Sequence, residues 1–260
     1  MGGRVRTEKE GRIGRIVFDH PERRNAISIA MWREIPHLAE QMERDEEIRV
    51  VVLRGAGEDA FVSGADISEF AEQRTGDAIR AYDADSGRAF AALATLSKPV
   101  IALVHGTCIG GGVAIALTAD LRYAADDAVF AIPAARLGLG YHAAGIEALA
   151  RVVGLSAAKE IFFTARRFDA QEALRMGLVN AVWPRADLER HVRETAERIA
   201  SNAPLTLRSV KLITGELSKP ASGRDLEAVE ASVRACFESE DYREGTRAFL
   251  EKRRPRFRGR

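Results

Sequence analysis

A block of three glycines is the first stretch of this sequence that could do chemistry. Gly110–Gly112 follow the apolar run Val100–Val104 and lead into the small residues Ala114–Ala119. This order predicts a buried strand, a turn and the N-terminus of a helix. Glycines carry no Cβ, so backbone N–H groups there can approach a ligand closely at the positive end of a helix dipole. The block therefore predicts a site for a negatively charged oxygen, although a packing turn without a ligand would use the same residues.

A second stretch offers another set of backbone amides that a ligand could approach. Val51–Arg54 has the composition of a strand, a polar loop covers Gly55–Asp59, and Phe61–Ile67 places small residues before a helical pattern over 66–72. Two N–H groups that converge on one carbonyl oxygen form an oxyanion hole. The two stretches together favour such a site over a simple packing turn.

Ordered blocks along nearly the whole chain resemble the enoyl-CoA hydratase/isomerase (crotonase) superfamily. The blocks are His20–Ile27, Phe61–Ile67, Ser97–Ala102, Gly110–Gly112, Ala119–Arg122 and the tail Ser239–Phe257. The resemblance implies an α/β fold of the crotonase (ClpP-like) type, a spiral of ββα units with a C-terminal helical trimerisation segment. It also implies that the N–H groups of Ala65 and Gly111 polarise the carbonyl of an acyl-CoA thioester and stabilise the enolate formed from it.

The same resemblance assigns residues to the substrate. Arg23 and Arg24 match a family loop that meets the phosphates and pantetheine of CoA, and guanidinium groups suit bidentate phosphate contacts. Lys252 matches a lysine that in relatives reaches the CoA of a neighbouring subunit. A solvated basic surface is the structural alternative for these residues, and capping of a helix is the alternative for Asp66. The other substrate-binding candidates are Ala26, Ser63, Asp66, Ile67, Ile109, Gly112, Pro133 and Leu137.

Two positions depart from the family pattern. A family hydratase uses one glutamate to activate water and another to supply a proton at Cα, and the matching positions here are Ala114 and Ala134. Because alanine cannot transfer a proton, we do not expect ordinary hydration by that mechanism, even though the oxyanion hole is predicted to be intact.

A titratable pair, Tyr141 and His142, falls in the same region and supplies the remaining catalytic candidates. Tyr141 matches a catalytic tyrosine of the superfamily's methylmalonyl-CoA decarboxylases, and His142 falls where some isomerases, dehalogenases and naphthoate synthases place an aspartate. The decarboxylase resemblance departs at Ala65 and Ala114, where those enzymes have a histidine and a glutamate. Either residue could replace the missing acids. A hydrogen-bonded wall residue and a solvated loop histidine are the respective structural alternatives.

Composition narrows the class of protein. The chain has 260 residues, 46% of them hydrophobic and 30% charged, with a net charge of +1. That balance argues against a dedicated nucleic-acid binder, since the basic run Lys252–Arg260 is local. No apolar stretch approaches the roughly 20 residues that span a bilayer, no signal peptide is visible, and two cysteines form no disulfide framework. We expect a cytoplasmic protein that uses no metal and no cofactor besides the CoA of its substrate.

The order of predicted elements indicates how the chain is divided. Strands and helices alternate to about Val182 and helices alone follow, which predicts a spiral core over 1–198 and a helical segment over 199–260. Apolar residues recur at helical spacing in that segment after the repeating units end, so we assign them to a subunit interface rather than to a cofactor site. The family forms trimers and pairs of trimers, and we expect a homotrimer or a dimer of trimers.

Two functional hypotheses follow. In the first, the chain is a crotonase-family acyl-CoA enzyme whose reaction passes through a thioester enolate, with decarboxylase-, isomerase- or hydrolase-type chemistry in place of hydration. In the second, it is a CoA-ester-binding protein with little or no catalysis, because both family glutamates are absent.

Overall fold

The computed structural model describes residues 2–66 and 77–260, so Ile67 and most of the helical pattern predicted over 66–72 lie outside the described residues. Two β-sheets form the centre of the molecule. The larger sheet has the order β1-β2-β3-β5-β7-β10, with strands at Arg4–Glu10, Ile13–Asp19, Val50–Gly55, Val100–Val104, Leu121–Ala125 and Ala181–Trp183. The smaller sheet has the order β4-β6-β8-β9, with strands at Ala60–Val62, Thr107–Ile109, Val129–Ala131 and Phe168–Asp169.

The chain visits both sheets on each of its central turns. β3 of the large sheet leads to β4 of the small sheet, β5 leads to β6, and β7 leads to β8. Strands from neighbouring turns of the spiral pair in parallel. Val51 of β3 pairs with Val100 of β5 in the large sheet, and Thr107 of β6 pairs with Val129 of β8 in the small sheet. β1 with β2, and β8 with β9, pair antiparallel. The arrangement confirms the predicted α/β spiral.

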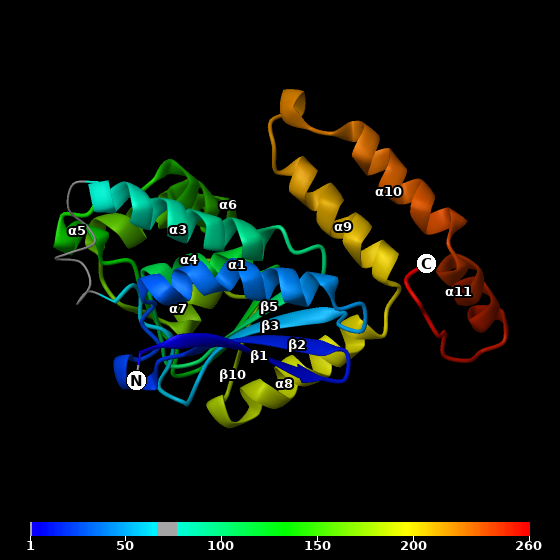
Figure 1. Cartoon of the computed structure of the whole chain (residues 1–260), viewed down its shortest axis with the longest axis horizontal. Coiled ribbons are helices and arrows are strands. Elements are labelled where there is room, and N and C mark those ends of the chain that lie inside the picture. Colours follow the sequence, from blue (N-terminus) through cyan, green and yellow to red (C-terminus); the bar gives the residue numbers. More distant parts are fainter. Residues whose placement is uncertain (1, 67–76) are drawn as a thin grey trace.

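Helices cover both faces of the large sheet (Figure 1). α1, α3 and α4 lie on one face, and α8 lies on the other, where four of its buried residues recur every fourth position and share one side of the helix. The helices of the core are α1 (Ile29–Arg44), α3 (Asp77–Ala94), α4 (Gly111–Thr118), α5 (Ala134–Leu137), α6 (Ala143–Thr164), α7 (Ala170–Arg175) and α8 (Arg185–Ala200), with a 3₁₀ turn at Pro21–Arg23.

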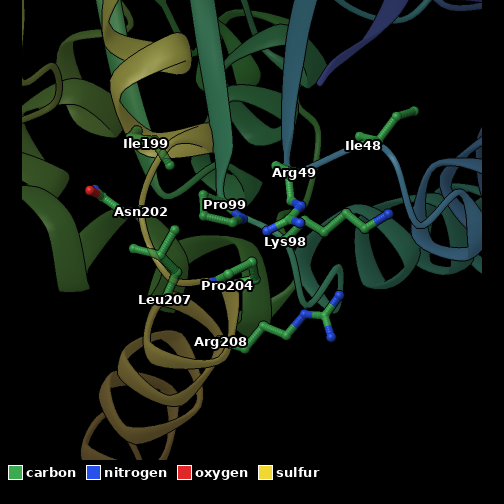
Figure 2. A pocket seen from close by; sticks show the side chains of 9 residues that line it. All are labelled: Ile48, Arg49, Lys98, Pro99, Ile199, Asn202, Pro204, Leu207 and Arg208. Carbon is green, nitrogen blue, oxygen red and sulfur yellow. The ribbon is translucent and has the colours of Figure 1, made fainter. Parts of the chain in front are cut away.

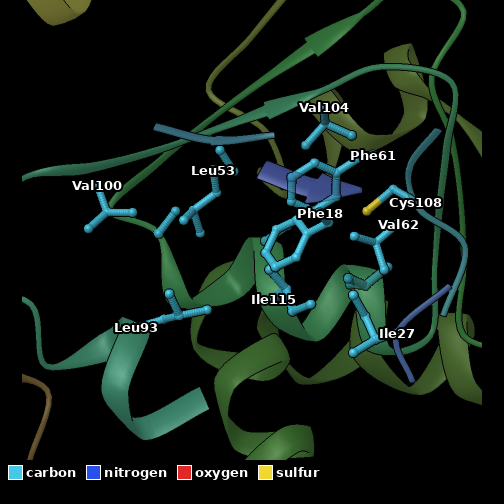
Figure 3. Packing of buried hydrophobic residues seen from close by; sticks show 14 of the residues in the cluster. Phe18, Ile27, Leu53, Phe61, Val62, Leu93, Val100, Val104, Cys108 and Ile115 are labelled. Carbon is cyan, nitrogen blue, oxygen red and sulfur yellow. The ribbon is translucent and has the colours of Figure 1, made fainter. Parts of the chain in front are cut away.

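Alternation along the strands explains why the apolar runs are continuous. In β3, Val51 and Leu53 pack toward α1 and α4, whereas Val50 and Val52 pack toward α8. Successive side chains of a strand point to opposite faces, and both faces of this sheet are covered. Figure 3 shows the cluster between the sheets, which includes Phe18 in β2 and Phe61 in β4. Their rings pack edge to face with 5.8 Å between the ring centroids. This contact joins the two sheets.

A helical arm follows the core. It consists of α9 (Pro204–Leu217), a 3₁₀ turn at Ala221–Gly223, α10 (Leu226–Glu238) and α11 (Glu240–Leu250), and it extends away from the sheets (Figure 1). The predicted division at 198/199 falls in the last turn of α8. In α6, Gly154 has a φ of 79° and marks a kink in the helix. Among the described helices, none has the length and apolar character needed to cross a membrane.

His105 is a buried titratable side chain of the core. It directly follows β5, is 6% exposed, and its Nε2 has no hydrogen-bond partner. Burial lowers the pKa of His105 to about 4, and the positive charges of Arg54 and Arg185 act in the same direction. The imidazole is therefore neutral in the folded protein at pH 5, whereas in the unfolded chain it is protonated.

We predict that this difference makes the fold acid-sensitive. Between pH 6.5 and about pH 4, His105 is protonated in the unfolded chain but neutral in the folded protein. Proton binding therefore favours the unfolded state, and the folded protein loses stability as the pH falls through this range. The loss between pH 7 and pH 5 should be about 2 kcal/mol. Urea unfolding at both pH values measures it. His105→Gln should remove most of this loss, whereas His37→Gln, at an exposed histidine of α1, should leave it unchanged.

Candidate active site

Two backbone segments from different turns of the spiral meet at the predicted oxyanion site. Gly111 is the first residue of α4, and a methyl group built on its Cα would lie 3.7 Å from the backbone nitrogen of Ala65. Glycines shape both approaches, since Gly64 has a φ of 114° and Gly110 has a φ of 54°. Residues that carry a side chain rarely adopt positive φ angles of this kind. The structure therefore places the backbone of Ala65 close to that of Gly111, while their role as an oxyanion hole stays a prediction.

Within residues 2–66 and 77–260, the N–H groups of Ala65 and Gly111 have no hydrogen-bond acceptor. α4 begins with the bond from the Ala114 N–H to the Gly110 carbonyl, which leaves the first-turn N–H of Gly111 unused. On either side of Ala65, the carbonyl of Gly64 and the N–H of Asp66 are bonded to Ile27, but no residue of the described part accepts from the Ala65 N–H. Both residues are half-buried. Two free donors near the positive end of α4 are suited to bind a partial negative charge.

Hydrogen bonds tie the arginine loop to this site. The N–H of Ser63 donates to the Arg24 carbonyl at 3.1 Å, and its hydroxyl donates to the Arg23 carbonyl at 3.0 Å. The Arg23 guanidinium, 51% exposed, pairs with the nearly buried carboxylate of Asp66 at 3.2 Å. Ala26 is buried in the same loop. Five of the predicted substrate-binding residues are thus gathered beside Ala65.

Asn25 holds this loop in place, a role that the sequence did not suggest. It is 1% exposed and has a φ of 58°. Its side-chain oxygen accepts from the His20 N–H at 3.0 Å, and its amide nitrogen donates to the carbonyls of Ala56 and Ala60 at 2.9 and 2.8 Å. Asparagine tolerates the left-handed conformation better than most residues, which could have pointed to a turn here.

A buried tryptophan lies directly behind the two amides. The Trp32 ring is 3.6 Å from the position that a Gly111 methyl group would take, and its indole N–H donates to the Tyr82 hydroxyl at 3.0 Å. Trp32 belongs to α1 and Tyr82 to α3. This hydrogen-bonded pair joins α1 to α3, and its indole ring packs beside the backbone of Gly111.

Ala114 and Ala134, the positions predicted to match the family glutamates, lie in α4 and α5. Ala114 is one helical turn after Gly111, so it lies on the same side of α4 and is half-buried. Ala134 begins α5 and is buried. The predicted contacts Ile109 and Pro133 flank this region, because Ile109 pairs with Ala131 and Pro133 caps α5.

Tyr141 and His142 occupy different environments. The Tyr141 ring packs edge to face on the Phe162 ring, with 4.8 Å between the ring centroids. It also lies over Gly145, where an added methyl group would be 2.7 Å from Cε1 of Tyr141. His142 is exposed at the start of α6, and its Nε2 lies 2.9 Å from the carboxylate of Asp83 on α3. Sequence reasoning missed Asp83. Tyr141 is thus a packed wall residue, and His142 belongs to an exposed imidazole–carboxylate pair.

Three further candidates remain. Leu137 is half exposed at the end of α5. Lys252 is exposed just after α11, which Figure 1 places at the opposite end of the molecule from α5. Ile67 lies outside the described residues. Within 2–66 and 77–260, no three His, Cys, Asp or Glu side chains form a group that could hold a metal ion.

Comparison with known proteins decides the family. A family model described as enoyl-CoA hydratase/isomerase matches residues 8–260. The chain belongs to this family. It is 37% identical over 255 residues to the short-chain-enoyl-CoA hydratase of Clostridium acetobutylicum, covering 95% of this chain and 94% of the relative. It is also 36% identical over 268 residues to a carnitinyl-CoA dehydratase of Escherichia coli, with complete coverage of both.

Solved structures agree with this family assignment. A crystal structure described as an enoyl-CoA hydratase/carnithine racemase from Magnetospirillum magneticum superposes with a TM-score of 0.94 at 34% identity, covering 98% of this chain and 96% of that one. An enoyl-CoA hydratase from Bacillus anthracis gives 0.92 at 32% identity, covering 98% and 99%. The predicted family is therefore confirmed, while the roles of individual site residues in this family member stay predictions.

Adjacent glycines of the turn have different surroundings. A methyl group on Gly112 would collide with the Val62 carbonyl oxygen of β4, whereas one on Gly111 would make ordinary contacts. We predict that Gly112→Ala lowers the free energy of unfolding by about 1–3 kcal/mol, because α4 must move away from β4. Gly111→Ala should be neutral or stabilising by up to about 1 kcal/mol. Urea unfolding of the two variants measures both, and equal destabilisation would contradict the assignment.

Proposed function

We propose that this family member acts on acyl-CoA thioesters and stabilises a thioester enolate between the N–H groups of Ala65 and Gly111. The observation that carries the proposal is the approach of these two unpartnered amides at the N-terminus of α4. A thioester carbonyl accepts both donors, and the bonds strengthen as negative charge develops on its oxygen. The Trp32–Tyr82 pair behind the amides keeps them in fixed positions, so little reorganisation accompanies the reaction.

The arginine loop supports CoA as the carrier of the acyl group. Arg23 and Arg24 stand beside the amides, and the Arg23 guanidinium is half exposed while Asp66 holds one of its edges. A guanidinium keeps further N–H groups for a phosphate when one is engaged. The proposal includes no cofactor other than this CoA. Its place of action is proposed to be the cytoplasm.

The proposed reaction is one that forms the enolate without a pair of carboxylates. In the decarboxylation of a 2-carboxyacyl-CoA, the bond between Cα and the carboxylate breaks, CO₂ leaves, and the electron pair passes into the enolate on the thioester oxygen. A proton then adds to Cα. This sequence needs the two amides and a proton donor, whereas hydration also needs a base for water, and Ala114 and Ala134 supply none.

The proton donor is one of two groups in this proposal. Tyr141 is held in the wall between Gly145 and Phe162, which favours a fixed hydroxyl. His142 is paired with Asp83, which orients the imidazole. Isomerisation or thioester hydrolysis would use the same groups, so the acyl substrate decides among them.

We propose that three copies form the working unit through the helical arm. The arm exposes large apolar side chains that a single chain leaves in water: Val210, Leu212, Leu217, Leu226, Phe237, Phe249 and Leu250. A patch of this extent is typical of an interface. Lys252, at the end of α11, would then be placed to reach CoA bound by a neighbouring copy.

The decisive variant is Gly111→Ala. Its methyl group would lie 3.7 Å from the Ala65 nitrogen and 3.6 Å from the Trp32 ring, where it would disturb the spacing of the two amides without straining the fold. We predict that turnover of the substrate falls by at least about 10²-fold. A screen of 2-carboxyacyl-, 3-ketoacyl- and enoyl-CoA esters by liquid chromatography identifies the substrate and measures the loss. If wild-type protein binds these esters and converts none, it is a CoA-ester-binding protein and the enzyme proposal is wrong.

We predict that hydration of crotonyl-CoA is slow. General acid and base groups each contribute about 10²–10⁴-fold, so a site with alanine at both positions should fall short of an efficient hydratase by at least one such factor. The loss of absorbance of the enoyl thioester measures the rate. Efficient hydration that survives Tyr141→Phe and disappears in His142→Gln would identify the histidine as the base and overturn the proposed decarboxylation.

A further inference from the structure

A small cavity lies at the base of the helical arm, away from the active site. It has a volume of about 10 Å³ and lies where β3 and β5 begin and where the chain passes from α8 to α9. That volume holds about one water-sized particle. Figure 2 shows the lining residues, with Arg49, Lys98 and Pro99 coming from the core and Asn202 and Arg208 from the root of the arm.

Three cationic side chains line this cavity. Lys98 is 2% exposed, and its ammonium donates to the carbonyls of Met42 and Asp45 at 2.5 and 2.6 Å. Arg49 donates through Nη2 to the Phe257 carbonyl at 3.4 Å, whereas its buried Nη1 has no partner. Arg208 has no hydrogen-bond or ion-pair partner in the described part of the chain. These bonds reach only neutral carbonyl oxygens, so all three charges lack a bonded anion.

The nearby carboxylates are engaged elsewhere. Asp241 accepts the N–H groups of Arg258 and Gly259 at 2.6 and 2.7 Å. Glu43 accepts from the backbone and hydroxyl of Ser97, and Asp45 pairs with Lys9.

The charges also destabilise one another. Burial lowers the pKa of Lys98, and the charges of Arg208 and Arg49 act in the same direction, while the carboxylates of Glu43 and Asp45 oppose the shift. Burial likewise lowers the pKa of Arg49, with Arg12 and Arg208 acting in the same direction and Asp241 opposing them. Lys98 is buried and Arg49 is half-buried, whereas Arg208 is exposed. Buried charge without a bonded counter-ion is costly, so an anion in the cavity would accept from the free Nη1 of Arg49 and reduce the repulsion among the three cations.

We propose that this cavity binds one monatomic anion, of the chloride type, which links the core to the helical arm. The volume is too small for a phosphate or sulfate, and the free Nη1 of Arg49 offers guanidinium N–H donors, a group that holds anions in proteins, while Lys98 and Arg208 add positive charge nearby. Because Arg49 and Lys98 belong to the core and Arg208 to the arm, the anion would contact both parts. The site has no part in the proposed acyl-CoA chemistry.

A bromide experiment tests the site directly. Crystals of the full chain grown in sodium bromide should show an anomalous scattering peak beside Nη1 of Arg49, because bromide replaces chloride at such sites. A cavity that contains only water, or a side chain of a neighbouring copy, gives no anomalous peak and overturns the proposal.

Stability in solution gives a second test. Urea unfolding is compared in sodium chloride and in sodium gluconate at equal ionic strength, since gluconate is too large to enter. When chloride is ten times its Kd, the ratio of folded to unfolded protein should rise about tenfold. Arg208→Gln should lose most of this rise, and Arg234→Gln, at an exposed arginine of α10, should keep it.

Two results of this comparison would overturn the proposal. The first is equal stability of the native chain in the two salts. The second is a chloride response that Arg208→Gln retains in full. If Arg208→Gln does not fold, the native chain in the two salts and the bromide crystals decide the matter.

Discussion

The close approach of α4 to β4 is the contact on which the active site depends. It exists because Gly112 presents no side chain to the Val62 carbonyl oxygen. The N-terminus of α4 can then pack closely against the small sheet, which places Gly111 beside Ala65. Any Cβ at Gly112 would push the N-terminus of α4 outward and separate the two amides. Tight packing and the proposed charge stabilisation thus rest on neighbouring residues of one turn.

The order of the elements could be predicted from the sequence because burial leaves a clear pattern. Val50–Leu53 and Val100–Val104 are continuous apolar runs since the large sheet is covered on both faces. The fold itself came from the resemblance of several ordered blocks, because apolar runs alone do not say that β3 and β4 belong to different sheets. That assignment depends on which strands pair, and the pairing partners are far apart in the sequence.

The candidate site was predicted unevenly for the same reason. Ala65, Gly111 and the arginine loop lie in recognisable motifs, and the structure gathers them. Trp32 with Tyr82, and Asp83 with His142, are contacts between distant helices that no local pattern announces. Gly111 and Gly112 are identical letters in the sequence, and only their surroundings distinguish the residue at the ligand position from the residue at the packing contact.

The spiral also determines how the chain must reach this structure. β3 pairs with β5 across the whole of α3, and β7 pairs with β10 across α5, α6 and α7. Long loops must therefore close before the large sheet gains its central hydrogen bonds, and the loss of chain entropy comes before the gain in contacts. Parallel sheets with such distant pairings fold slowly. Until β5 and β7 take their places, β3 remains an apolar strand edge that can pair with another unfinished chain.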